Sequence, residues 1–244
     1  MRIGTRRLRA VLRLFAELFD PQWARELEAE LRWLAYQLGA VRDLDVLRER
    51  LREATPSEHR LLLRQMQTVL GKRHRAAQQA MIESLKNERF GELIERLKAA
   101  KLSAPTTIEA LGNASDVLTP RLHAAREKLV RLGNKLSRND DSLKYHHVRK
   151  SAKRVRYVQE ALVVTLDKPG RIEALRLIKQ LKKLQDVLGE LQDSVVARET
   201  FKLMLKKEKF HGPLRSAIRK LQSSQSRSEK KARKKFPAVW AKLK

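Results

Sequence analysis

The chain has 244 residues, enough for one large domain or two small ones with a sizeable core. It has 55 Lys and Arg against 28 Asp and Glu, and this net charge of +27 points to a polyanionic partner: nucleic acid, an anionic membrane surface or polyphosphate. The absence of cysteine excludes disulfides and thiolate metal sites, and aromatic residues, at 5%, are too few to favour the reading of single-stranded bases by stacking.

Apolar residues recur with a helical period nearly throughout, and Gly and Pro are scarce, so the sequence predicts an all-α protein. The expected helices cover about 2–19, 21–52, 57–86, 89–101, 120–137, 142–166, 171–208, 213–235 and 237–243. Prolines mark several breaks, among them Asp20-Pro21 and Thr119-Pro120. Apolar runs such as "ALVVTL" (161–166) are too short to span a bilayer, so we expect a soluble, cytoplasmic protein.

The chain divides into two halves that resemble each other. Residues 103–119 are the least charged and most turn-rich stretch, so we expect helical halves at 1–102 and 120–244. "RIGTRRLR" (2–9) aligns with "RKSAKRVR" (149–156), and 31–46 align with 181–196 at nearly the same offset. Two ordered matches predict a duplicated module, hence two pseudo-symmetric antiparallel bundles. A helix precedes the second basic segment but not the first. The repeat therefore leads us to expect an N-terminal helix in the architecture that this sequence does not contain.

The first basic stretch concentrates arginine on one side of a helix. Arg2, Arg6, Arg9 and Arg13 fall within about 60° of one another. An ordinary solvated face mixes charges of both signs, yet residues 1–16 and 142–159 contain no acid. We interpret the two stretches as walls of one basic site for a phosphate polymer, with a plain solvated face as the alternative.

His146 lies one turn before Arg149 in "YHHVR", which is a poor zinc site without cysteines or nearby acids. We interpret His146 as a phosphate contact whose pKa would rise beside anions; the alternative is a partly buried structural histidine. The sequence shows no nucleophile with an accompanying base around His146. Trp33 and Tyr36, on the second helix, are expected in the core.

Asp43 and Asp193 each follow a glycine, Gly39 or Gly189, by four residues. A glycine lets another helix approach, and the acid can then bond basic side chains on that helix. We expect the two acids to orient cations for the ligand, although ordinary ion pairing between helices explains the pattern equally well.

Four segments together resemble the CHAD family, the conserved histidine α-helical domain: "RIGTRRLRAVLRLF", "LRWLAYQLGAVRDLDVL", "HHVRKSAKRVRYVQEAL" and "LKKLQDVLGELQDSVVA". The resemblance implies two helical bundles around a central basic channel that binds inorganic polyphosphate without catalysis. It also implies association with polyphosphate granules or with a phosphate-cleaving tunnel enzyme.

The family signature H-x-x-R-x-x-x-K/R-R-x-R is met in the second half from His146 to Arg156, including Arg154. In the first half Arg2, Arg6, Arg7 and Arg9 meet it, but its histidine would fall before Met1. The Arg42-Asp43 pair has the counterpart Gln192-Asp193, so the two walls should be unequal. The full expected site is Arg2, Arg6, Arg9, Arg13, Arg42, His146, Arg149, Lys150, Lys153, Arg156, Lys182 and Lys183, supported by Asp43 and Asp193.

Three other functions stay open. A nucleic-acid-binding protein would spread its cations along an outer helix, and we expect nucleic acid to bind only non-specifically. A phosphohydrolase or phosphotransferase using His146 would need a metal or carboxylate cluster, which the sequence does not indicate; no cofactor, metal or catalytic residue is expected. A scaffold for an acidic protein is the third. Basic runs such as "KKARKK" (230–235) are expected to be exposed and alone indicate little.

Overall fold

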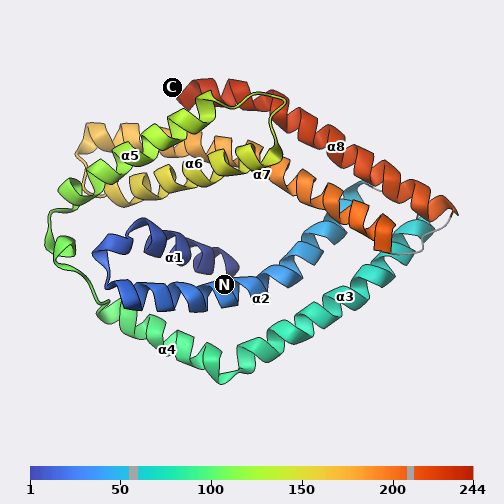
Figure 1. Ribbon diagram of the computed structural model, residues 1–244, viewed down its shortest axis with the longest axis horizontal. Helices are drawn as coiled ribbons and strands as arrows, with labels where there is room; N and C mark the ends of the chain where they lie inside the picture. The colour runs from blue at the N-terminus through green and yellow to red at the C-terminus, as the bar shows by residue number, and fades with distance from the viewer. Residues whose placement is uncertain (55–59, 208–211, 244) are drawn as a thin grey trace. The chain divides into compact units, whose positions relative to one another are not determined.

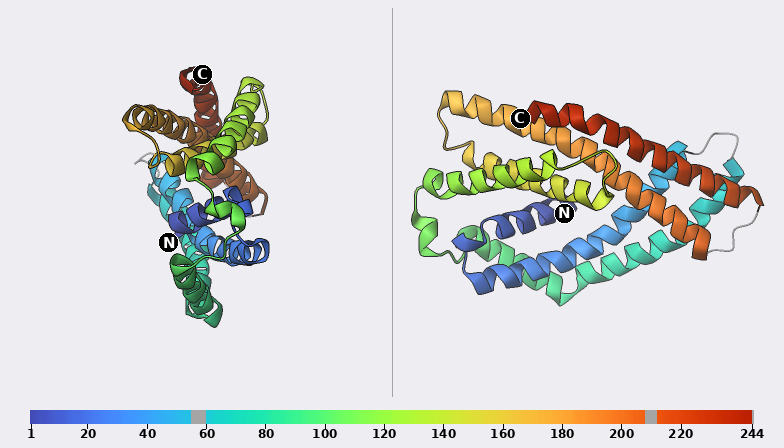
Figure 2. Two further views of the ribbon diagram at one scale, coloured as in Figure 1. Left: turned by 90° about the vertical axis from the view of Figure 1, so that its left-hand side faces the viewer. Right: turned by 45° about the horizontal axis from the view of Figure 1, so that its top comes forward.

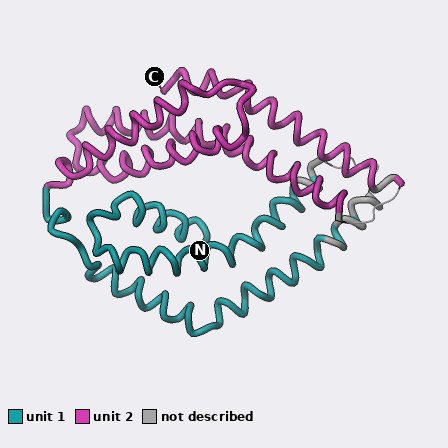
Figure 3. Tube along the Cα trace, in the orientation of Figure 1, with its two compact units in different colours: residues 1–112 teal, residues 113–244 magenta. Residues whose placement is uncertain are grey.

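The computed structural model describes residues 1–54, 60–207 and 212–243 (Figure 1). Within these ranges the chain forms α-helices and short 3-10 turns, with one isolated bridge between Phe19 and Thr106 in place of any strand. The prediction of an all-α protein is therefore confirmed. The chain separates into two compact units, residues 1–112 and 113–244 (Figure 3).

The first unit is built around the long helix α2, against which α1, α3 and α4 pack. Its elements are α1 (Arg2–Leu14), η1 (Ala16–Leu18), α2 (Pro21–Ala54), α3 (Arg60–Lys86), α4 (Glu88–Leu102) and η3 (Ile108–Leu111). The core consists of leucines from three of these helices: Leu12, Leu27, Leu31, Leu34 and Leu93. Their spacing on α2 is the three-and-four repeat of an amphipathic helix, so one stripe of α2 faces the core.

The second unit contains α5 (Ala114–Asn134), α6 (Ser142–Leu162), α7 (Lys168–Lys207), α8 (Gly212–Trp240) and η4 (Ala241–Leu243). α6 packs between α5 and α7, and α8 lies along α7 (Figure 2). The core joins aliphatic side chains of α5, α6 and α7 to the aromatic rings of Tyr145, Phe236 and Trp240. Gly133 leaves the space that the indole of Trp240 occupies, because a Cβ there would collide with the ring.

Helix bounds differ from the expectation at several places. α5 begins at Ala114, within the expected connecting segment, because the side chain of Asn113 accepts a hydrogen bond from Ser115 N at 3.0 Å and caps the helix. Pro120 therefore lies inside a helix that we expected it to begin. α1 ends at Leu14, since the following residues turn to join the 105–107 segment, where Asp20 N donates to the carbonyl of Pro105. The expected ends at 57 and 208 lie outside the described residues.

The prediction for the aromatic residues of α2 is wrong for Tyr36. Trp33 packs against the core, and the guanidinium of Arg89 lies over its ring, 4.5 Å from the ring centroid. Tyr36 is 76% exposed. It is rotated by about 200° from the buried Leu34 on the helix, so it lies on the opposite side from the core stripe.

Candidate functional site

A buried carboxylate on α2 gathers three arginines of the first unit. Nε of Arg9 donates to Oε1 of Glu28 at 3.0 Å, and Nη2 of Arg32 donates to Oε2 at 2.6 Å. Nη2 of Arg13 also bonds Oε1. The side chain of Glu28 is only 11% exposed, so two cations from α1 and one from α2 converge on a largely buried anion.

The electrostatics keep this carboxylate charged. Burial alone would raise the pKa of Glu28, but the hydrogen bonds from Arg32, Arg9 and Arg13 outweigh it, and the net pKa is lowered. Arg9, whose side chain is 20% exposed, thereby belongs to the packing between α1 and α2. Arg13 and Arg32 stay more than half exposed and keep guanidinium edges toward solvent.

The other basic residues of α1 and α2 are less constrained. Nη2 of Arg2 donates to Oδ1 of Asp43 at 3.3 Å, so the acid after Gly39 does contact a cation on the neighbouring helix. Arg6 and Arg42 are exposed and make no hydrogen bond or ion pair with a described residue. The surface formed by α1 and α2 therefore retains an excess of positive charge.

His146 lies on α6 against α7 of the second unit. Its Nδ1 is 3.1 Å from Oε1 of Gln192, and because an amide oxygen accepts, Nδ1 donates and Nε2 is left as the basic atom. Burial lowers the pKa of His146, and the charges of Lys150, Arg149 and His147 lower it further, against the opposing effect of the Gln192 bond. The imidazole is thus neutral at pH 7 within a cationic neighbourhood.

Arg149 shows what the glycine of α7 accommodates. A Cβ on Gly189 would lie 3.3 Å from Nη2 of Arg149, so the guanidinium of α6 rests in the space that this glycine leaves. Nε of Arg149 is buried and finds no hydrogen-bond acceptor in the described part of the chain. Around Gly39, by contrast, the space for a Cβ is open, so the interpretation of a close approach holds at Gly189 and is wrong at Gly39.

The remaining expected residues of the second unit vary in their surroundings. The guanidinium of Arg156 lies 3.5 Å from Glu160 and 4.9 Å from the ring centroid of Tyr157, which holds it near its own helix. Lys153 and Asp193 each interact with another residue. Exposed lysines complete the set: Lys150, Lys182 and Lys183. Each unit therefore brings a basic helix against its neighbour, while a channel shared by the two units stays a prediction.

Sequence reasoning missed Glu28 and Gln192. Glu28 stands one turn before Arg32, a spacing that can indicate an ion pair on one helix. Its bonds to Arg9 and Arg13 depend on how α1 crosses α2, which no local pattern encodes. The sequence marked Gln192 only as a departure from the family pattern, which expects a basic residue or a histidine at this position, and gave no indication that it bonds His146.

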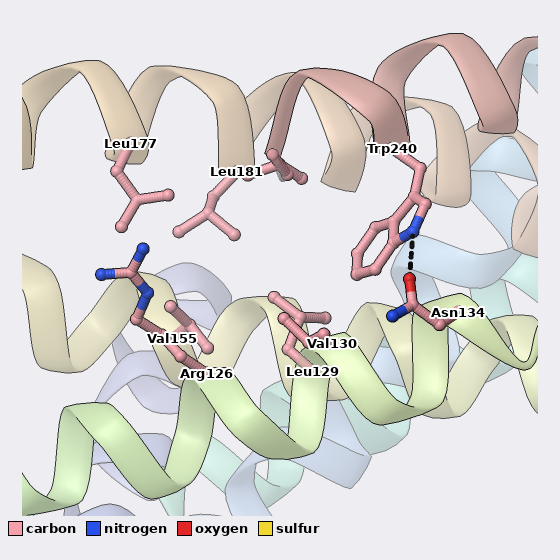
Figure 4. Close-up of a pocket in the computed structure, with 9 residues that line it drawn as sticks. Arg126, Leu129, Val130, Asn134, Val155, Leu177, Leu181 and Trp240 are labelled. Atoms are coloured by element: carbon pink, nitrogen blue, oxygen red, sulfur yellow. Dashed lines mark hydrogen bonds between the residues drawn. The ribbon is translucent and has the colours of Figure 1, made fainter.

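The second unit also contains a mostly apolar pocket of about 310 Å³, with the charged side chain of Arg126 in its wall (Figure 4). Leucine and valine side chains of α5, α6 and α7 line it, together with the indole of Trp240, whose Nε1 donates to Asn134 at 3.2 Å. With one cation among mostly apolar side chains, this lining does not suit a phosphate polymer. Within the described ranges, no three side chains gather that could hold a metal ion. No described helix is both long and apolar enough to cross a bilayer.

Comparison with known structures places the fold. The chain superposes on PptA from Streptomyces chartreusis with a TM-score of 0.77 and 19% identity, covering 98% of this chain and 87% of that one. It superposes on the crystal structure of the CHAD domain from the plant Ricinus communis with a TM-score of 0.72 and 23% identity, covering 100% of this chain and 79% of that one. At these identities the likeness shows a common fold.

Sequence comparison extends this likeness. Two uncharacterized proteins from strains of Mycobacterium tuberculosis, MT2285 and Rv2226, are each 28% identical to this chain over 214 residues. The match covers 82% of this chain and 38% of each relative, so the chain spans about two fifths of their length. The family model of the CHAD domain matches residues 1–202, most of the sequence. The chain therefore belongs to the CHAD domain family.

Proposed function

We propose that this chain binds inorganic polyphosphate through basic side chains on α1 with α2 and on α6 with α7, without catalysing a reaction. Membership of the CHAD family supports a polyphosphate-related role. The observation that carries the proposal is that a neighbouring helix holds the arginines in place. Arg2 bonds Asp43, Arg13 bonds Glu28, and Arg149 rests on Gly189. Location in the cytoplasm, on granules or beside a tunnel enzyme stays a prediction.

Held arginines suit a phosphate polymer for two reasons. The planar guanidinium binds two phosphate oxygens at once, whereas lysine acts as a point charge. A side chain that is already ordered loses less conformational freedom on binding, so more of the contact energy appears as affinity. The buried Nε of Arg149 lacks an acceptor among the described residues, and a bound phosphate would supply one.

The surroundings of His146 support binding over phosphoryl transfer. A general base is oriented by a group that accepts from its other nitrogen, and it lies beside a nucleophile. Gln192 orients His146 in this way, but within the described chain the imidazole is flanked by cations and bonds no nucleophile. Because Nδ1 donates to Gln192, Nε2 of the neutral imidazole can take up a proton when an anion arrives, and the imidazolium then donates from Nε2 to a phosphate oxygen.

A competition titration tests the proposal. Fluorescent long-chain polyphosphate is bound to the full chain at about 150 mM salt, where charges farther apart than roughly 8 Å are screened. The complex is then challenged with pyrophosphate, duplex DNA and single-stranded RNA. We expect the affinity for polyphosphate to exceed the affinity for each competitor by orders of magnitude, compared at equal phosphate concentration. Equal competition by DNA or RNA would reduce these helices to a generic basic surface.

A matched pair of variants locates the site. Arg6→Gln with Arg42→Gln removes from α1 and α2 two exposed charges that bond no described residue, so the fold should be retained. Arg64→Gln with Arg75→Gln removes two exposed charges from α3 and changes the net charge equally. We expect the first pair to weaken polyphosphate binding at least tenfold and the α3 pair by less than threefold. Equal losses would show that net charge alone drives binding.

A further inference from the structure

The helix α8 has an unusual distribution of charge. It lies beyond the residues that the family model matches, which end at 202. Its 29 residues include a single acid, Glu229, which is buried. That acid accepts hydrogen bonds from Arg198 at 2.7 Å and from Arg233 at 2.7 Å, so these two arginines balance its charge inside the unit. No acid is left to balance the outer surface of α8.

The two sides of α8 differ sharply. Ile218, Leu221, Gln225, Ala232 and Phe236 are buried, and their spacing of three and four residues defines the side that packs in the unit. Exposed cations occupy the other side, which we name the α8 basic face: Arg215, Arg219, Lys220, Arg227, Lys230, Lys231 and Lys234. Lys235, which bonds Glu190 at 3.4 Å, is not part of it.

We propose that the α8 basic face is a docking surface for the phosphate backbone of double-stranded nucleic acid, bound irrespective of base sequence. The cations are spread along the length of the helix, over an arc of about 160°, instead of converging on a point. Arg215 and Lys234 are separated by about 28 Å along the axis, at roughly 1.5 Å per residue. One turn of duplex DNA is about 34 Å long, so the face matches nearly one turn of a rigid array of phosphates.

Charge geometry favours a duplex over a flexible polyanion at this face. A duplex presents about one negative charge per 1.7 Å of its axis in a fixed arrangement. A flexible single chain must lose conformational freedom to follow a convex row of side chains, whereas a duplex is already ordered. Among the described residues, no carboxylate bonds the arginines of this face and no glycine packs against them, unlike the contacts of Arg13 and Arg149.

The described side chains of α8 argue against two other partners. A helix that binds a membrane surface inserts a large apolar face, but the apolar side of α8 is buried in the unit. Binding of single strands relies on exposed aromatic rings, and both Phe236 and Trp240 are buried. A surface with cations alone fits contacts to phosphate rather than reading of bases.

Two triple variants of the full chain test the inference. Arg219→Gln, Arg227→Gln and Lys234→Gln remove three charges from the α8 basic face. Arg64→Gln, Lys72→Gln and Arg75→Gln remove three exposed charges from α3, so both variants lower the net charge of +27 by the same amount. Binding of a fluorescein-labelled 30-base-pair duplex is measured by anisotropy between about 50 and 300 mM salt.

We expect the α8 variant to lose at least tenfold in duplex affinity at about 150 mM salt and the α3 variant less than threefold. The slope of log affinity against log salt should fall by about 2–3, because each phosphate contact contributes roughly 0.9. A second duplex of unrelated sequence should bind equally well. Polyphosphate affinity of the α8 variant should stay within threefold of the wild type, which separates this surface from the proposed polyphosphate site.

Several results would overturn the inference. One is absence of duplex binding by the wild-type chain, and another is an equal loss in the two triple variants. Duplex binding that survives in the α8 variant but disappears with Arg6→Gln and Arg42→Gln would place DNA in the polyphosphate site. Vesicles of phosphatidylserine and phosphatidylcholine give the last comparison: if only vesicle binding is lost in the α8 variant, the face binds membranes instead.

Discussion

Replacing Glu28 by glutamine should destabilise the first unit strongly, although the residue belongs to a charged cluster. Glutamine keeps the shape and one acceptor but removes the charge that three guanidiniums share, at 3.0 Å for Arg9 and 2.6 Å for Arg32. Breaking a buried ion pair costs about 3–5 kcal/mol, and two of the three arginines are exposed. We therefore expect the free energy of unfolding to fall by about 2–4 kcal/mol.

Urea unfolding at pH 7, followed by far-UV circular dichroism, measures this loss through the shift of the transition midpoint. Glu26→Gln is the matched control, since Glu26 lies on the same helix and pairs at 2.8 Å with the exposed Arg96. Exposed pairs contribute little, so that variant should unfold close to the wild type. Coincident midpoints for the two variants would refute the reasoning that Glu28 anchors the cluster.

The pH dependence supplies an independent check. Burial opposes the charge of Glu28, but the arginines prevail and lower its pKa below the ordinary 4.5. A carboxyl whose pKa is lowered by folding stabilises the fold fully above its unfolded pKa and loses that effect as pH falls through the folded value. The stability difference between wild type and Glu28→Gln should thus be constant from pH 7 to about pH 5 and shrink below about pH 4.5. A difference that grows toward acid would contradict the lowered pKa.

Two further predictions concern the second unit. Gly189→Ala should weaken polyphosphate binding severalfold, because the new Cβ crowds the guanidinium of Arg149 at 3.3 Å; Gly39→Ala, with open space around it, should leave binding unchanged. Both variants gain about 0.5–1 kcal/mol of helix propensity, so thermal unfolding checks that any loss is local. Polyphosphate affinity should rise as pH falls from 8 to 6, since bound phosphates favour protonation of His146, whose pKa is lowered in the free protein. His146→Gln should flatten that profile, and an unchanged profile would exclude His146 as the source.

Some of this protein could be predicted because the information is local. The spacing of Leu27, Leu31 and Leu34 defines a helix and its buried side without reference to any other segment. The acid-free composition around Arg2 and Arg149 indicates a polyanionic partner in the same way. Proline was less reliable, since Pro120 lies inside α5 where the cap at Asn113 determines the start.

The amino-acid sequence by itself determined the fold class, the basic helices and the resemblance to the CHAD family, because helical period, charge and motif spacing are properties of neighbouring residues. Only the tertiary structure decided which arginines are bonded and which are free. Arg9 and Arg13 meet Glu28, and Arg149 meets Gly189, because helices distant in sequence pack at particular crossings. The energy of those contacts depends on burial and distance, which a linear pattern does not encode.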